Sequence, residues 1–341
     1  MNEKSKLNIT NERNHTIDFL KGLAIILIVI THFEWTSKEI RNFTFPYIIN
    51  MAVPIFMIIT GYVYSMSYDK KNVEHLEDAY SLRLIVPKII RYTLPFLFIV
   101  IWEIIDPRIP MHFNKKLDAL QWFLDGTVGK GSYYYPIMIQ LVFVFPLIYF
   151  VIKKKMSGGG YICLIINIVY EVLVWAYMIP SESYRLLIFR YVFLIGMGVY
   201  AWHGYKLNFR MSFLITATGA IFITVITYFN YTPRIVNKAW AGTNFISSML
   251  IVPLMVWLIQ NANIKFAPLE LLGRASYNIF LVQMVYYRGY YEWLGAILHN
   301  RICHLILGFF LCILVGILFY LIETPITKKV IGRLFGNKGK V

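Results

Sequence analysis

Residues 16–35, TIDFLKGLAIILIVITHFEW, decide the class of fold. This stretch is apolar and long enough to cross a bilayer as a helix, which takes about 20 residues. It nevertheless carries Asp18, Lys21 and His32. Ionisable side chains inside a membrane span are costly, so they indicate a functional site unless a partner explains them. The sequence therefore predicts a membrane helix that carries chemistry.

Lys21 and His32 lie at different depths of this predicted helix. They are eleven residues apart, and a rise of about 1.5 Å per residue separates them by roughly 16 Å along the axis. One side chain is therefore expected near one membrane face, and the other beyond the midplane.

The composition extends this prediction to the whole chain. Of its 341 residues, 58% are hydrophobic and only 15% are charged, and the mean hydropathy is +0.59. A soluble domain has about 25% charged residues. The chain is therefore predicted to be an all-α polytopic membrane protein.

Apolar runs of membrane-spanning length give ten predicted helices. They cover residues 17–36, 45–67, 84–104, 133–152, 159–179, 184–203, 211–229, 242–260, 276–291 and 303–323. The predicted domain organisation is a cytosolic segment at 1–16, a transmembrane domain at 17–323 and a basic cytosolic tail at 324–341.

The distribution of Lys and Arg gives the orientation, because cytosolic loops carry an excess of both. With the N-terminus in the cytosol, the inner segments hold 20 of the 33 Lys and Arg residues. The outer segments and span edges hold 11, and Lys21 and Arg190 lie within spans. Ten spans also return the C-terminus to the cytosol.

The net charge of +15 does not indicate a nucleic-acid partner, because the charges fall in short loops between apolar runs. The cysteines, Cys163, Cys303 and Cys312, lie in apolar segments without metal or redox spacing. We therefore expect no bound metal and no bound nucleic acid.

The position of His32 allows two interpretations. Imidazole is suited to proton transfer near neutral pH and can activate a hydroxyl for attack on an acyl group. The alternative is a histidine that is merely hydrogen-bonded at the outer end of a helix. Asp18 and Lys21 share a helix face and could pair at the inner interface. Lys21 either snorkels and fixes the depth of the helix or binds a phosphate-bearing substrate.

Arg83, Lys88 and Arg91 lie where a basic loop enters the third span. Lys88 and Arg91 are three residues apart and so share a helix face. Arginine forks and lysine charges commonly hold phosphate oxygens, whereas ordinary anchoring at the inner membrane face is the alternative.

Glu171 and Arg190 are expected at similar depths of two neighbouring antiparallel spans. Two costly charges in a membrane are usually compensated by pairing. We expect a structural ion pair here rather than a catalytic role.

Six further side chains are candidates for acceptor binding. Tyrosines at an outer interface usually form an aromatic belt, but they can also stack on a sugar ring. The candidates are Tyr133, Tyr134, Tyr135, Gln140, Tyr277 and Gln283.

Together, these motifs resemble the acyltransferase 3 family of bacterial integral membrane acyltransferases. The opening pattern I-D-x-L-R/K-G-x-A, followed by an apolar run and His, is matched by residues 17–24 and His32. The later matches are FMIITGY at 56–62, the basic pair Lys88 and Arg91 with Pro95, the aromatic entry at 131–149, LGRASYNIFLV at 272–282 and Glu323 with Pro325.

The sequence departs from the family pattern at three positions of the site. Lys21 and Lys88 each occupy the place of an arginine, which keeps the charge but not the bidentate fork. Gln283 stands where many members carry histidine, which leaves His32 as the single candidate base. A fused extracytoplasmic esterase-like domain, found in some members, is not expected.

The resemblance implies an O-acyltransferase of the bacterial plasma membrane. Acyl-CoA, in the simplest case acetyl-CoA, would dock at the cytosolic face on Lys21, Arg83, Lys88 and Arg91. His32, with Lys21 and Asp18 on its helix, would act as general base or transient acyl carrier. The acceptor would be a hydroxyl of an extracytoplasmic polysaccharide or cell-wall glycan.

Two functions from other classes compete with this prediction. One is a glycan or lipid exporter or flippase without covalent chemistry, which is weakened because no internal repeat is evident. The other is a non-catalytic sensor or scaffold in which the charged spans serve only helix packing.

Overall fold

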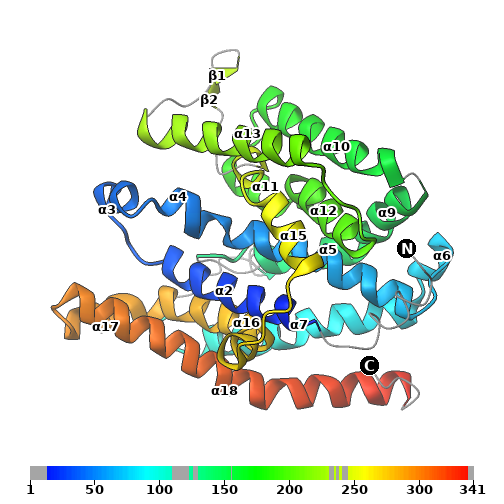
Figure 1. Cartoon of the computed structure of the whole chain (residues 1–341). Coiled ribbons are helices and arrows are strands. Elements are labelled where there is room, and N and C mark those ends of the chain that lie inside the picture. Colours follow the sequence, from blue (N-terminus) through cyan, green and yellow to red (C-terminus); the bar gives the residue numbers. More distant parts are fainter. Residues whose placement is uncertain are drawn as a thin grey trace.

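Helices make up almost all of the computed structural model, which describes residues 14–109, 123–125, 130–154, 156–229, 234–235, 238–239 and 245–336 (Figure 1). The strands within these residues form one small antiparallel hairpin, β1 (Arg234–Ile235) with β2 (Lys238–Ala239). The all-α prediction is therefore confirmed.

Six helices in the described part of the chain are long and apolar enough to cross a membrane. They are α5 (Ala52–Lys70) with the preceding α4 (Phe45–Ile48) and η1 (Ile49–Met51), α7 (Leu82–Ile105) with the preceding α6 (Leu76–Ala79), α9 (Tyr134–Lys154), α10 (Met156–Ala176), α13 (Phe209–Tyr228) and α18 (Arg301–Phe335). The chain is thus a multi-pass membrane protein.

The other four predicted spans are also helical but shorter, broken or more polar. The first is α2 (His15–Thr31), with 17 residues. The remaining three are α11 (Ser181–Leu186), η2 (Ile188–Tyr191) and α12 (Val192–Trp202); α14 (Phe245–Ser248) and α15 (Val252–Asn261); and α16 (Ala267–Val285), η3 (Tyr286–Tyr290) and α17 (Tyr291–Ile297). Helix length and composition within the described residues therefore support six of the ten predicted spans and do not confirm the other four.

The chain breaks these segments for local reasons. Gln140 of α9 accepts a hydrogen bond from the Ile188 amide at 3.0 Å and donates one to the Leu186 carbonyl at 2.6 Å. This clamp satisfies the backbone between α11 and η2, where helical bonds are lost. Gln140, a predicted acceptor-binding residue, is therefore part of the scaffold. In the segment that contains α14 and α15, a proline, which suits a first helical turn, opens α15.

Helix α2 begins after its N-cap Asn14, whose side chain accepts from the Ile17 amide at 3.3 Å. It packs most extensively against α16. A Cβ at Gly22 would collide with the Leu269 carbonyl, and one at Gly273 with the Asp18 carbonyl. The two motif glycines therefore allow backbone-to-backbone contact, as small residues do between membrane helices.

A second close crossing joins α5 to α12. Here Gly61 lies against the Ile195 carbonyl, and Gly198 lies against the Ile58 carbonyl. Helix α2 in turn packs against α5 as well as against α16.

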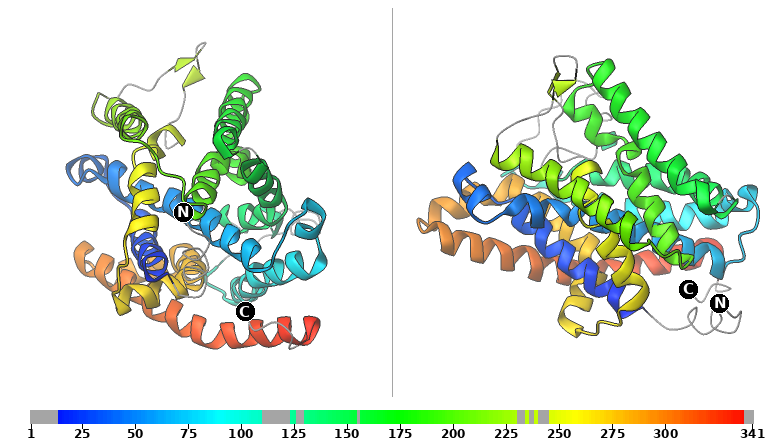
Figure 2. Two further views of the ribbon diagram at one scale, coloured as in Figure 1. Left: turned by 45° about the vertical axis from the view of Figure 1, so that its right-hand side comes forward. Right: turned by 45° about the horizontal axis from the view of Figure 1, so that its top comes forward.

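The arrangement places α2 in the middle of the molecule (Figure 1). In all views α16 lies beside it, α18 runs along one border, and α10 and α13 lie toward the opposite side (Figure 2). The far end of α18 lies at the same end of the molecule as α6, whereas α3 (Ser37–Asn42) and α17 lie at the other end. Helix α18 continues without a break past the predicted span to Phe335.

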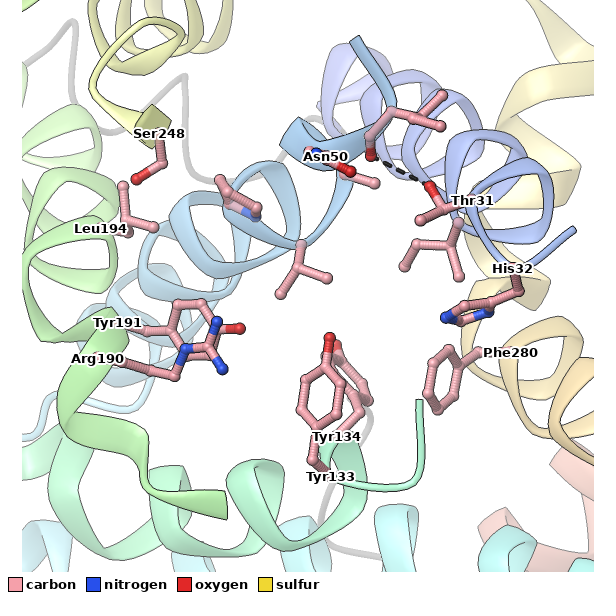
Figure 3. A pocket seen from close by; sticks show the side chains of 15 residues that line it. Thr31, His32, Asn50, Tyr133, Tyr134, Arg190, Tyr191, Leu194, Ser248 and Phe280 are labelled. Atoms are coloured by element: carbon pink, nitrogen blue, oxygen red, sulfur yellow. Dashed lines mark hydrogen bonds between the residues drawn. The ribbon is translucent and has the colours of Figure 1, made fainter. Parts of the chain in front are cut away.

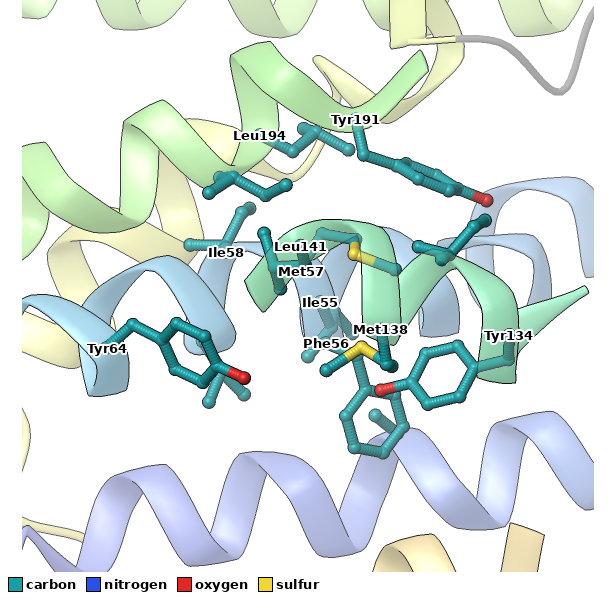
Figure 4. Close-up of a cluster of buried hydrophobic side chains, with 14 of the residues drawn as sticks. Ile55, Phe56, Met57, Ile58, Tyr64, Tyr134, Met138, Leu141, Tyr191 and Leu194 are labelled. Atoms are coloured by element: carbon teal, nitrogen blue, oxygen red, sulfur yellow. The ribbon is translucent and has the colours of Figure 1, made fainter. Parts of the chain in front are cut away.

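A cluster of buried apolar side chains lies between α5, α9 and α12. Met57, Met138 and Leu141 are buried there, with Leu194 on the α12 side (Figure 4). Helices α10 and α13 instead present exposed apolar side chains such as Ile165 and Phe213, as expected of helices that face lipid. Helices α5, α9 and α12 therefore form the interior of the molecule, whereas α10 and α13 lie at its surface.

Candidate active site

His32 caps the C-terminal end of α2. Its Nδ1 lies 2.7 Å from Oε1 of Gln283, a fully buried residue of α16. With an amide oxygen facing it, Nδ1 carries the proton and donates, so Nε2 keeps its lone pair. This is the tautomer that a general base requires. Gln283, predicted to bind the acceptor, thus contacts the candidate base.

Three further residues hold the His32 region. Lys130 donates to the His32 carbonyl at 2.9 Å. Gly131 has a φ of +96° and lies against the His32 ring, so a side chain at this position would be strained and crowded. Tyr287 meets the imidazole edge-on at 5.9 Å and donates to the Val29 carbonyl at 2.9 Å.

Tyr287 belongs to η3, a π-helical turn that joins α16 to α17. Such turns often occur at functional sites because they shift the register of the side chains that follow. Here the turn brings Tyr287 over the end of α2. None of these contacts was predicted, because the residues are remote from His32 in sequence.

Two cavities border α2, and we name them outer and inner after the membrane faces that the sequence predicts for the two ends of this helix. The outer cavity, of about 200 Å³, opens beside His32 (Figure 3). It lies between α2, η1 with α5, α9, η2 with α12, and α14. Its lining comprises Ile28, Thr31, His32, Ile49, Asn50, Ala52, Val53, Pro54, Tyr133, Tyr134, Arg190, Tyr191, Leu194, Ser248 and Phe280. The imidazole and the Arg190 guanidinium face each other across it.

An inner cavity of about 350 Å³ lies along the first half of α2. It contains Asp18 and Lys21, both partly buried, together with Arg274 of α16. The other lining residues are Ile28, Phe56, Thr60, Val63, Tyr64, Tyr92, Tyr134, Met138, Gly273, Ser276, Tyr277, Phe280 and Tyr320. Lys21 and His32 therefore line different cavities although they lie on one helix.

Three side chains belong to both cavities: Ile28 of α2, Tyr134 of α9 and Phe280 of α16. The rings of Tyr134 and Phe280 pack with their centroids 4.9 Å apart, and Ile28 is buried. These three residues form a thin apolar wall between the two spaces. We call them the dividing wall.

The basic cluster of the third span is not assembled as one phosphate site. Lys88 is buried against the rings of Tyr64 and Tyr68, with Nζ 4.3 and 4.2 Å from their centroids. Such cation–π contacts compensate a desolvated charge. Arg83 and Arg91 are exposed. None of the three lines the inner cavity, whereas Arg274, which was not predicted to bind, does.

The tyrosines that were predicted to bind the acceptor lie in different parts of the structure. Tyr133 and Tyr134 line the outer cavity, and Tyr277 lines the inner one, donating to the Tyr92 carbonyl at 2.9 Å. Tyr135 points elsewhere: its ring stacks on Phe96 with centroids 3.8 Å apart. Two of the three consecutive tyrosines therefore line the outer cavity and the third does not, because successive side chains of a helix point in different directions.

Glu171 and Arg190 are joined through a third residue. The Tyr184 hydroxyl donates to the Glu171 carboxylate at 2.7 Å, and the Arg190 guanidinium lies over the Tyr184 ring at 4.7 Å. Tyr184 thus contacts both of the charges that were predicted to pair. Arg190 also lies at the outer cavity, which the expected structural role did not include.

The described residues contain no group of three or more His, Cys, Asp and Glu side chains arranged to hold a metal ion. The chemistry that this arrangement can perform is acid–base chemistry at His32, with cations at the inner cavity.

Comparison with known proteins bears on this arrangement. A family model described as an acyltransferase domain matches residues 14–321, which include both cavities and all three residues of the dividing wall. No curated protein and no solved structure matches the chain. Because the match covers most of the sequence, this chain belongs to the acyltransferase 3 family of membrane acyltransferases.

Proposed function

We propose that the protein transfers an acyl group, in the simplest case acetyl, from cytosolic acyl-CoA to a hydroxyl of an extracytoplasmic glycan in the bacterial plasma membrane. One observation carries the proposal: a single helix lines both cavities, with Lys21 in one and His32 in the other. The side chains that line both cavities are the three residues of the dividing wall.

The inner cavity is assigned to the donor. Lys21 and Arg274 are cations at its lining, and cations of this kind bind phosphate oxygens. The exposed Arg91 and Arg83 would attract the nucleotide portion from the cytosol, whereas buried Lys88 supports the aromatic face that Tyr64 presents to the cavity. The acyl thioester would then point toward the dividing wall.

The outer cavity is assigned to the acceptor, and His32 to the chemistry. Nε2 takes the proton of the acceptor hydroxyl as its oxygen attacks the thioester carbonyl. The carbon–oxygen bond forms, the carbon–sulfur bond breaks, and the coenzyme A thiolate leaves, finally receiving the proton held by the imidazolium. The alternative, in which His32 carries the acyl group transiently, uses the same two cavities.

This transfer requires the thioester carbonyl to pass the dividing wall. Ile28, Tyr134 and Phe280 offer no hydrogen-bonding group to a small acyl chain other than the Tyr134 hydroxyl. The wall would admit an acyl group while keeping the charged nucleotide on the cytosolic side, because moving phosphates into an apolar barrier is strongly unfavourable.

The test is mass spectrometry of surface glycans from cells with no protein, with wild type and with His32→Ala. The proposal predicts an acyl mass that is present only with the wild type, while the amount of exported glycan stays unchanged. If His32→Ala stops glycan export but leaves the ester on the remaining glycan, the protein is an exporter rather than an acyltransferase.

A further inference from the structure

Among the described residues that line the outer cavity, Arg190 is the one arginine, and its environment is unusual. Its guanidinium lies 4.7 Å from the ring centroids of both Tyr184 and Tyr191 and 6.0 Å from that of Tyr133. Its Nη1 is buried and has no hydrogen-bond partner among the described residues. A charged nitrogen in this state is costly unless something supplies the missing acceptor.

The aromatic rings compensate only part of that cost. Cation–π contacts favour the charge but leave the N–H groups without acceptors. Glu171 acts on Arg190 electrostatically, but its carboxylate is a hydrogen-bond acceptor for Tyr184. The Arg190 guanidinium is therefore surrounded by aromatic rings, and its Nη1 can still donate hydrogen bonds to a ligand.

None of the described residues that line the outer cavity is acidic, so no carboxylate there balances the charge of Arg190. Its polar groups are hydroxyls and amides such as Asn50 and Ser248, together with His32 and Arg190. Figure 3 shows Arg190 on the side opposite His32, with open space between them. A ligand that spans this space would meet a base at one end and a cation at the other.

We propose that the outer cavity selects acceptors that carry an anionic group, a phosphate or a carboxylate, and that Arg190 binds this group while the hydroxyl to be acylated lies at His32. The inference rests on the proposed function, since it names the class of acceptor for the same site. The planar guanidinium fork fits both anions through paired hydrogen bonds, which a neutral sugar cannot match.

A purely structural Arg190 would behave differently. If the residue only holds η2 against α9 and α10, its replacement lowers thermal stability but changes the affinity for charged and neutral ligands equally. Selectivity between ligands therefore separates the two roles, and stability alone does not.

The experiment measures binding of three probes to full-length protein in lipid nanodiscs by isothermal titration calorimetry. The probes are glucose 1-phosphate, glucuronate and glucose. Wild type should bind at least one acidic probe about tenfold to hundredfold more tightly than glucose, as hydrogen bonds to charged groups allow. The acidic probe with the lower Kd identifies whether phosphate or carboxylate is preferred.

Arg190→Gln should reduce this preference to within about twofold, and Arg190→Lys should keep only part of it. Arg41→Gln is the matched control, because Arg41 is an exposed arginine of α3 outside the cavity lining. It should leave the preference unchanged. If Arg190→Gln does not fold, the loss of preference in Arg190→Lys carries the test.

Equal affinity of wild type for glucose and both acidic probes would overturn the inference, as would an undiminished preference in the folded Arg190 variants. Neither result touches the proposed function, whose test is the surface ester that depends on His32. Conversely, an acidic preference without any such ester would leave Arg190 as an anion-binding residue and refute the acyltransferase mechanism.

Discussion

The two cavities along α2 differ in the chemistry that their side chains offer. The inner cavity is larger, about 350 Å³ against about 200 Å³, and holds a carboxylate with two cations, Asp18 with Lys21 and Arg274. The outer cavity holds the imidazole and one arginine, and no acidic side chain among the described residues that line it. In the proposed function, the mixed charge lies beside the donor and the base beside the acceptor, as transfer between two compartments requires.

The characteristic side chains of both cavities lie on one helix, α2. Asp18 and Lys21 lie in the first turns of α2, whereas His32 is its C-cap. The close crossing with α16 at Gly22 and Gly273 fixes the inner half, and the hydrogen bond to Gln283 of the same helix fixes the outer end. Helix α16 therefore sets the position of both functional regions relative to each other.

The largest effect should follow from removing the base of the outer cavity. His32→Ala is expected to lower the rate of acyl transfer about 100-fold to 10,000-fold, the usual contribution of general acid–base catalysis. The binding of acyl-CoA at the inner cavity should persist, because His32 does not line it. Radiolabelled acetyl transfer in membrane vesicles measures the first quantity, and thermal stabilisation by acetyl-CoA measures the second.

His299→Ala is the matched control, because His299 is an exposed histidine between α17 and α18. It should retain full transfer. Comparable loss in both variants would show that histidine replacement acts through folding and not through the base.

Removing the cation of the inner cavity should have the next largest effect. Lys21→Ala is expected to raise the KM for acyl-CoA about tenfold to hundredfold, since a charge-assisted phosphate contact is worth about 1.5–3 kcal/mol. Lys21→Arg should restore most of the affinity. Lys328→Ala, an exposed lysine near the end of α18, serves as control, and an equal KM change there would point to general surface charge.

A smaller effect is expected at the residue that orients the base. Gln283→Leu removes the acceptor for the Nδ1 proton, so kcat should fall about tenfold while the KM for acyl-CoA stays unchanged. Gln283→His, which can still accept from Nδ1, should recover part of the rate. A change in KM alone would place Gln283 at the donor, contrary to its contact with His32.

The smallest effect should come from the dividing wall. Ile28→Ala widens the passage between the cavities, so transfer of propionyl relative to acetyl should rise by up to about tenfold, the discrimination that one methylene allows. Ile25→Ala is a matched change on the same helix, since Ile25 is buried but lines neither cavity. An equal rise in both variants would mean that looser packing, rather than the wall, controls acyl length.

The sequence predicts those parts of the molecule that depend on local pattern. Hydrophobic runs indicated where the helices lie, and the spacing of Lys21 and His32 indicated two depths that the structure places in two cavities. Breaks were missed where a remote side chain causes them: Gln140 clamps the backbone near Leu186, 46 residues later in the chain.

The contacts of the site could not be read from spacing, because they join distant segments. Gln283 is 251 residues from His32, and Lys130 reaches the His32 carbonyl from 98 residues away. Lys88 looked equivalent to Arg91, but tertiary packing buries Lys88 against the rings of Tyr64 and Tyr68 while Arg91 stays exposed. Arg274 and Arg190 gain their roles only from the cavities that tertiary packing creates.

In the proposed function, the donor reaches one half of α2 and the acceptor reaches the other. This division can be measured with a membrane-impermeant maleimide applied to Asn50→Cys and Thr60→Cys, each in a background without Cys163, Cys303 and Cys312. Asn50 lines the outer cavity and Thr60 the inner one. We predict that Thr60→Cys is labelled only in inside-out vesicles and is protected by acetyl-CoA, and that Asn50→Cys is labelled only in right-side-out vesicles without protection. If both cysteines are labelled from the same side, or if acetyl-CoA protects only Asn50→Cys, the donor and the acceptor do not reach opposite halves of α2.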